Sequence, residues 1–172
     1  MKEKTIIGRS EWCAFPDLHV AAIKARVDSG AKTSSIHAFN IETFERDDAP
    51  WVRFEVHPLV NDLDITIVCE QAVADKRLVK SSSGEAESRY VIRTPIQLAG
   101  KVWEVDLTLS NRDSMGHRML LGREAMNGRL IIDPSLSCTQ GRMKINDLKK
   151  AYKEASVLAA KMSLEFSINT SS

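Results

Sequence analysis

Short stretches of alternating apolar and polar residues follow one another along most of this chain, and they constrain its fold more than any other feature. In one such stretch, Ile23, Ala25 and Val27 fall on one face of an extended strand, and Lys24 and Arg26 fall on the other. The patterns predict strands over residues 20–28, 39–43, 51–56, 64–73, 90–98, 101–109 and 130–132. Many short strands with this spacing are typical of a small closed or folded-over β structure.

Three segments depart from the strand pattern. The dipeptide Ala99-Gly100 predicts a hairpin turn, and the polar, serine-rich residues 79–88 predict a mobile loop. After Asn146-Asp147, which can cap a helix, apolar residues recur at helical spacing: Leu148, Tyr152, Ala155, Leu158, Ala159 and Met162. The chain is therefore expected to form a β domain over residues 1–140, a helical extension over 141–165 and a frayed tail over 166–172.

Bulk composition indicates an ordinary globular protein. The chain has 172 residues, of which 43% are hydrophobic and 27% charged, and its net charge is +1. This balance does not favour nucleic acid or a membrane surface as a partner. No apolar run approaches the length of about 20 residues that spans a bilayer, and the N-terminus shows no signal-peptide core. Cys13, Cys69 and Cys138 are odd in number and widely spaced, so we interpret them as reduced thiols of a cytoplasmic protein.

The run Val27-Asp28-Ser29-Gly30-Ala31 is the strongest indication of chemistry. An acid at a strand end is followed by a hydroxyl that can lock a loop, by a glycine that lets backbones approach, and by a small residue that leaves room for a substrate. Aspartic peptidases need such a loop, but their chemistry requires two carboxylates. No second Asp-Ser-Gly or Asp-Thr-Gly occurs, which excludes an internally duplicated enzyme and predicts a homodimer. The alternative is a simple β-turn, for which Asp-Ser-Gly is also suitable.

Two separated segments resemble the retropepsins, the aspartic peptidases of retroviral type. The first is Ala25-Arg26-Val27-Asp28-Ser29-Gly30-Ala31, and the second is Met119-Leu120-Leu121-Gly122-Arg123, which is similar to the second signature of that family. Longer stretches over residues 24–38 and 111–123 resemble a prokaryotic retropepsin-like family whose members are often labelled ATP-dependent zinc proteases. The resemblance covers residues 5–135, which is most of the chain.

This resemblance implies a mostly β, single-lobe acid-protease barrel, with a short helix after Leu120-Leu121-Gly122-Arg123 and a C-terminal helix outside the match. A flap hairpin would be formed by the strands at 64–73 and 90–98, with Lys76 to Ser88 at its tip. One position departs from the viral pattern. Viral enzymes tend to carry an acid after the active-site run, where it pairs with the arginine of the second signature, and this chain has Lys32 there. Arg123 therefore needs another partner.

The resemblance also implies an aspartic endopeptidase, in which two Asp28 carboxylates, one from each subunit, activate a water. Ser29 would hydrogen bond across the dimer, and Gly30 and Ala31 would let a substrate backbone approach. Further candidates for substrate contact are Lys32, Thr33, His37 and Gly84. The family is associated with glutamate-ligase partners that modify a ribosomal protein, which suggests an acidic peptide substrate by analogy.

The sequence contains no motif for binding the zinc or the ATP that the family label names. The four histidines, His19, His37, His57 and His117, are scattered, no His-Glu-x-x-His motif occurs and no cysteines are paired at ligand spacing. A glycine-rich phosphate loop is also missing. We therefore expect neither a metal nor another cofactor. Two alternatives to the aspartic peptidase stay open, namely a binding or assembly module of the same fold without catalysis, and a zinc hydrolase.

Overall fold

The computed structural model describes residues 3–60, 63–80, 83–111, 116–141, 144 and 146–153. Its strands are β1 (Thr5–Ile7), β2 (Ser10–Phe15), β3 (Val20–Val27), β4 (Ser34–His37), β5 (Phe39–Arg46), β6 (Ala49–Val56), β7 (Ile67–Ala72), β8 (Asp75–Lys80), β9 (Ala86–Leu98), β10 (Lys101–Ser110), β11 (Met119–Leu121) and β12 (Leu130–Ile132). A 3-10 helix, η1 (Pro16–Leu18), follows β2, and the helix α1 (Arg123–Met126) lies between β11 and β12. The predicted mostly β fold, with a short helix after the Leu-Leu-Gly-Arg segment, is confirmed.

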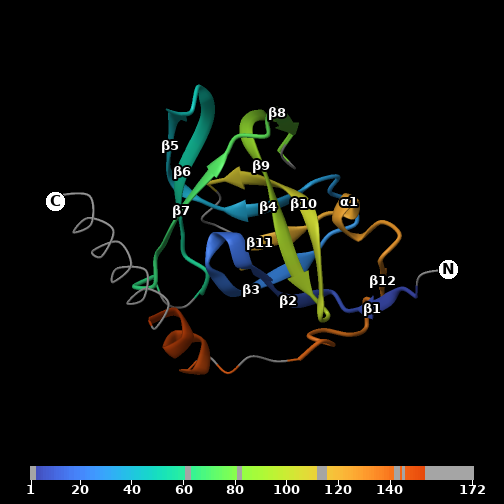
Figure 1. The fold of residues 1–172 in the computed structure, drawn as a ribbon. Helices are drawn as coiled ribbons and strands as arrows, with labels where there is room; N and C mark the ends of the chain where they lie inside the picture. Colours follow the sequence, from blue (N-terminus) through green and yellow to red (C-terminus); the bar gives the residue numbers. More distant parts are fainter. Residues whose placement is uncertain are drawn as a thin grey trace.

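A closed barrel occupies the centre of the molecule (Figure 1). The largest sheet has the strand order β10-β4-β11-β3-β2-β9-β8. Because β9 also pairs with β10, the strands of this sheet other than β8 close into a ring. The turn between β9 and β10 places Ala99 (φ 55°) and Gly100 (φ 73°) in the left-handed region, as a two-residue hairpin loop requires. The hairpin predicted at this dipeptide is confirmed.

The flap hairpin was predicted from the wrong strands. β7, which lies within the predicted strand 64–73, pairs with β6 and not with β9. The hairpin is formed by β8 and the first part of β9, so most of the stretch from Lys76 to Ser88 is strand and not loop. Among the described residues, only 83–85 belong to the turn at its tip. The serine-rich composition concealed these strands, because a hairpin that projects from the barrel is held by its backbone hydrogen bonds and needs no regular apolar face.

Two smaller sheets flank the barrel. β5, β6 and β7 form an antiparallel sheet, and Figure 1 shows the β5–β6 hairpin and the β8–β9 hairpin both projecting upward from the barrel. β1 and β12 form a parallel pair in which Ile6 lies beside Ile131. The predicted strand over residues 130–132 is confirmed, and Ile131 is 50% exposed because this two-stranded sheet lies at the surface.

One continuous hydrophobic core fills the barrel and the space below the three-stranded sheet. Its completely buried members come from both regions, and they include Phe15, Ile23, Ile36, Phe54, Ile92, Ile96 and Leu107. The three cysteines are free, and Cys13 and Cys69 are buried. Burial raises the pKa of each of these two thiols to about 12, which makes them inert members of the core.

The helix near the C-terminus packs on this same core. Residues 146–153 are helical, and Leu148 and Tyr152 are buried. The hydroxyl of Tyr152 donates to the carbonyl oxygen of Ala22 and accepts from its N–H, which ties the helix to β3. The other predicted helical positions and the tail 166–172 lie outside the described residues. Within the part of the chain that is described, no helix is long and apolar enough to cross a membrane.

Glu11 on β2 is a buried acid that joins distant parts of the chain. Its carboxylate accepts hydrogen bonds from the N–H of Gly8 (2.8 Å), the N–H and hydroxyl of Thr139 (3.0 and 2.8 Å) and the N–H of Gln140 (3.1 Å). Burial alone would raise the pKa of Glu11, but these hydrogen bonds outweigh it, so the pKa lies below the ordinary value. Glu11 therefore fastens the segment after β12 to the barrel as a carboxylate.

Candidate active site

Asp28 stands where β3 leaves the barrel and the active-site loop begins. β11 runs parallel to β3, with Leu121 in register with Val27. The N–H of Asp28 donates to the carbonyl oxygen of Leu121 at 2.9 Å, which continues the ladder by one residue. The Leu-Leu-Gly strand therefore fixes the backbone from which the carboxylate extends.

The carboxylate of Asp28 is held over a tight turn. Its Oδ1 accepts a hydrogen bond from the N–H of Gly30 at 2.9 Å, and the N–H of Ala31 donates to the carbonyl oxygen of Asp28 at 3.2 Å. A Cβ atom at residue 30 would lie 3.1 Å from Oδ1, so glycine lets the backbone come this close. Asp28 is half-buried, and the neighbouring Ser29 is exposed.

Gly122 lets the second signature pass directly against the loop. A Cβ atom on Gly122 would lie 2.7 Å from the carbonyl carbon of Thr33 and 2.9 Å from the nitrogen of Ser34. The N–H of Gly122 donates to the hydroxyl of the buried Ser34 at 3.0 Å. Backbone contact of this kind explains why a glycine follows Leu121, since any side chain would force the two segments apart.

The helix α1 holds the other side of the loop. The N–H groups of Arg123 and Glu124 donate to the carbonyl oxygens of Ala31 (2.8 Å) and Lys32 (3.1 Å). The guanidinium of Arg123 donates to the carbonyl oxygen of Gly30 at 3.1 Å, and this is the partner that the sequence did not identify. Lys32 forms an exposed ion pair with Glu124 at 3.8 Å. Four contacts therefore fix residues 30–32, although residue 32 is not an acid.

A cleft of about 780 Å³ opens beside Asp28. The loop contributes Asp28, Gly30, Ala31, Lys32 and Thr33, the flap contributes Arg77, Leu78, Val79, Lys80 and Arg89, and the barrel contributes Ser35, Thr108 and Leu120. The structure thus brings Asp28, Gly30 and Ala31 together with Lys32 and Thr33 at this cleft, whereas Ser29 does not line it. The flap residues were missed, and the three basic side chains within the run of residues 76–80 were the signal that could have found them.

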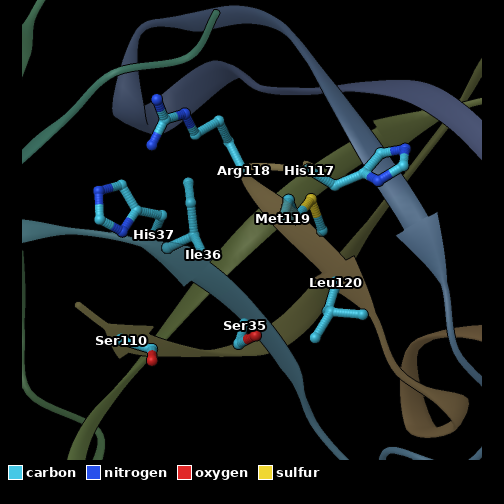
Figure 2. Close-up of a pocket in the computed structure, with 8 residues that line it drawn as sticks. All are labelled: Ser35, Ile36, His37, Ser110, His117, Arg118, Met119 and Leu120. Carbon is cyan, nitrogen blue, oxygen red and sulfur yellow. The ribbon is translucent and has the colours of Figure 1, made fainter. Parts of the chain in front are cut away.

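Two predicted substrate contacts do not line this cleft. Gly84 lies at the flap tip with a φ of 85°, and no heavy atom of the described residues lies within 4 Å of the position that its Cβ would occupy. His37 is buried near the far end of β4 and lines a separate cavity of about 10 Å³ with His117 and Arg118 (Figure 2). Figure 2 shows His37 and Arg118 on one side of β11 and His117 on the other. Such a cavity is on the order of the space needed by one water, too small for a substrate side chain.

The described histidines, cysteines and acids do not form a metal centre. No three of them converge in a way that could hold an ion within the described ranges. His37 is stacked near Phe39, which in turn stacks on His57 at 4.3 Å between ring centroids. Burial lowers the pKa of His117, and Lys24 and Arg26 lower it further. The donor set therefore does not fit the zinc that the family label names.

A one-lobe β barrel whose single Asp-Ser-Gly loop is fixed by a Leu-Leu-Gly strand, with a flap hairpin bordering the cleft, is the architecture of a retropepsin-like protein. The chain belongs to the RimB-like family, described as the retropepsin-like aspartic endopeptidase RimB, and the match covers residues 6–143. A crystal structure of a Legionella pneumophila protein of unknown function is similar, with 29% identity and a TM-score of 0.68 over 80% of this chain and 99% of that one.

Curated relatives carry a different name. Proteins of Desulfotalea psychrophila, Shewanella pealeana and Parasynechococcus marenigrum, which are 62%, 58% and 53% identical to this chain, are each named "Probable alpha-L-glutamate ligase". The first match takes in 87% of this chain but 32% of the relative, so the chain spans about a third of the length of such proteins. None of these names confirms the label of ATP-dependent zinc protease.

Proposed function

We propose that this chain is one subunit of a homodimeric aspartic endopeptidase and that Asp28 is its catalytic residue. The observation that carries the proposal is the position of this carboxylate. It is half-buried, its loop is fixed by β11 and α1, and it borders a cleft large enough for several substrate residues. Among the described residues that line this cleft, it is also the only acid.

The proposed mechanism uses two Asp28 side chains that meet at a two-fold axis. Two carboxylates in contact do not both ionise, so the pair holds one proton. The ionised partner takes a proton from a water, whose oxygen attacks the scissile carbonyl carbon, while the protonated partner donates to the carbonyl oxygen. The C–N bond then breaks as a proton passes to the leaving nitrogen, and the pair returns to its starting state.

Dimer formation would use the exposed part of the loop. The hydroxyl of Ser29 makes no hydrogen bond to the residues that the structure describes, and the side chain faces outward beside Asp28. In a two-fold dimer the same patch of each subunit meets its own copy, so two Ser29 hydroxyls would approach the opposite loops together. This arrangement would complete the catalytic pair and hold it in place.

The substrate is proposed to be an extended, acidic peptide. An extended chain could add strand-like hydrogen bonds along the flap, which borders the cleft through β8 and β9. Acidic character is supported by the relatives named as glutamate ligases and by the basic flap residues Arg77, Lys80 and Arg89. A peptide built or extended by a glutamate ligase would present several carboxylates to them.

The names of the relatives also favour a second candidate function. Because this domain occurs within longer proteins named as ligases, it could act as a module that binds a glutamate-rich chain without cutting it. Both candidates use the same cleft, but only the peptidase needs two copies of Asp28 in one site.

The rate of peptide cleavage, measured as a function of the dimer fraction, distinguishes the peptidase from the binding module. Cleavage of a glutamate-rich peptide should rise with the square of the chain concentration below the dimer dissociation constant and linearly above it. Cleavage by monomers at an undiminished rate would contradict the two-carboxylate mechanism. Tight binding without any cleavage at high dimer fraction would favour the binding module.

A further inference from the structure

The flap contains a buried arginine with an unused donor. Arg89 on β9 is only 5% exposed, and its Nε donates to Oε2 of Glu87 at 3.2 Å. Its Nη2 is buried and has no hydrogen-bond partner among the residues that the structure describes. Burying a charged donor without a partner carries a large desolvation cost, so such a group in a folded protein calls for an explanation.

The cross-strand neighbour of Arg89 is a second arginine. Arg77 on β8 lies directly opposite Arg89 in the antiparallel register, and both side chains line the cleft beside Asp28. Like charges in this relation destabilise a hairpin unless acids compensate them. Arg77 is compensated by Asp75 (2.7 Å) and Asp106 (3.3 Å), whereas the one described acid that pairs with Arg89 is Glu87, whose side chain is 52% exposed.

The cleft as a whole concentrates positive charge. Among the described residues, four cations line it, namely Lys32, Arg77, Lys80 and Arg89, against the one acid Asp28, although the whole chain has a net charge of only +1. Of these cations, Arg89 is the buried one, and the Nη2 of its planar guanidinium has no acceptor within the described part of the chain. A carboxylate matches this geometry, because a guanidinium can give it two parallel hydrogen bonds.

We propose that Arg89 is a specificity-determining residue, which donates hydrogen bonds to the carboxylate of one acidic side chain of the bound peptide. This inference rests on the proposed function of the same cleft. A glutamine side chain at that position would lack the negative charge, and its amide could offer the buried donor only one neutral oxygen. A site with a buried polar group left unpaired rejects such an analogue strongly.

Binding, measured apart from cleavage, tests the proposal. The full chain with Asp28→Asn would be titrated against two labelled peptides, Ala-Ala-Glu-Glu-Ala-Ala and Ala-Ala-Gln-Gln-Ala-Ala, by fluorescence anisotropy. We expect the Glu peptide to bind roughly ten- to a hundredfold more tightly, as a hydrogen bond to a charged group allows. Adding Arg89→Met should bring the two affinities to within a few-fold of each other.

The control variant is Arg53→Met, which removes the same charge from an exposed position on β6 and should leave the preference unchanged. Arg89→Lys keeps the charge but not the planar fork, so it should retain only part of the preference, and it serves if Arg89→Met does not fold. Equal binding of the two peptides by the chain that carries only Asp28→Asn would overturn the assignment. An unchanged preference after Arg89→Met or Arg89→Lys would do the same. Cleavage of the peptides by the chain with Asp28 intact separates this result from failure of the peptidase proposal.

Discussion

The guanidinium of Arg123 donates to the carbonyl oxygen of Gly30 at 3.1 Å and so joins the second signature directly to the active-site loop. In the viral pattern to which this chain is similar, an acid after the loop takes that role. Here Lys32 occupies the position and pairs with Glu124, the residue after Arg123. A cation at position 32 thus replaces the acid of the viral pattern, and Arg123 donates to a backbone carbonyl instead of to a carboxylate. The loop therefore keeps its attachment to α1 with a different set of partners.

Asp28→Asn should lower peptide cleavage by about a hundredfold or more, because the pair loses the group that exchanges protons with water and substrate. The fold should persist, since the amide oxygen can still accept the Gly30 N–H. The measurement is kcat/KM together with thermal unfolding. Asp47→Asn is the matched control, because Asp47 lies in an exposed turn with a positive φ that asparagine tolerates. Cleavage by Asp28→Asn at the parent rate would contradict the aspartic mechanism.

Ser29→Ala should weaken the dimer without unfolding the subunit. The hydroxyl is exposed, so its loss costs the subunit little, but the dimer would lose two symmetric hydrogen bonds. The dimer dissociation constant should rise on the order of tenfold, measured by sedimentation. Ser29→Thr keeps the hydroxyl and should keep the dimer. An unchanged constant for Ser29→Ala would show that Ser29 has no role in the contact.

Gly122→Ala should destabilise the chain by about 1–3 kcal/mol, measured by urea unfolding. The added methyl group would meet the backbone of Thr33 and Ser34, which cannot move aside as a side chain could. Gly116→Ala is the control, because its Cβ position has no heavy atom within 4 Å in the described part of the chain and its φ is not positive. Equal stability of the two variants would mean that β11 and the loop are not tightly packed.

Glu11→Gln should destabilise the chain at neutral pH but not in acid. The pKa of Glu11 is lower in the folded chain than the ordinary value of 4.5 in the unfolded one, so its contribution is complete above pH 4.5 and is lost as the pH falls through the folded pKa. At pH 7 the variant should lose about 1–3 kcal/mol, because an amide cannot accept from all four donors. Unfolding free energies at pH 7 and pH 3 check this. A pH-independent difference would contradict the assignment.

Sequence patterns that involve only neighbouring residues made much of the fold predictable. The alternation of Ile23, Ala25 and Val27 predicted β3, and the dipeptide Ala99-Gly100 predicted the turn between β9 and β10. The Asp28 loop and the Leu121-Gly122 segment were recognisable because their residue types meet strict backbone requirements. Each of these features depends on a few adjacent residues, so the sequence alone carries it.

Contacts between distant segments were decided only by the tertiary structure. The flap partner of β9 is β8 and not β7, since pairing depends on which strands the barrel leaves with free edges. His37 follows Ser35 by two positions, yet about 7 Å of strand separates them, so only Ser35 reaches the cleft.

By itself, the sequence determined the β character of the chain, the single Asp28 loop and the need for a second copy of it in any two-carboxylate mechanism. The tertiary structure decided the partner of Arg123 and the burial of Arg89 in the cleft that Asp28 also lines. The physical reason is that hydrogen-bond partners and burial depend on strand register across the barrel, which local periodicity does not encode.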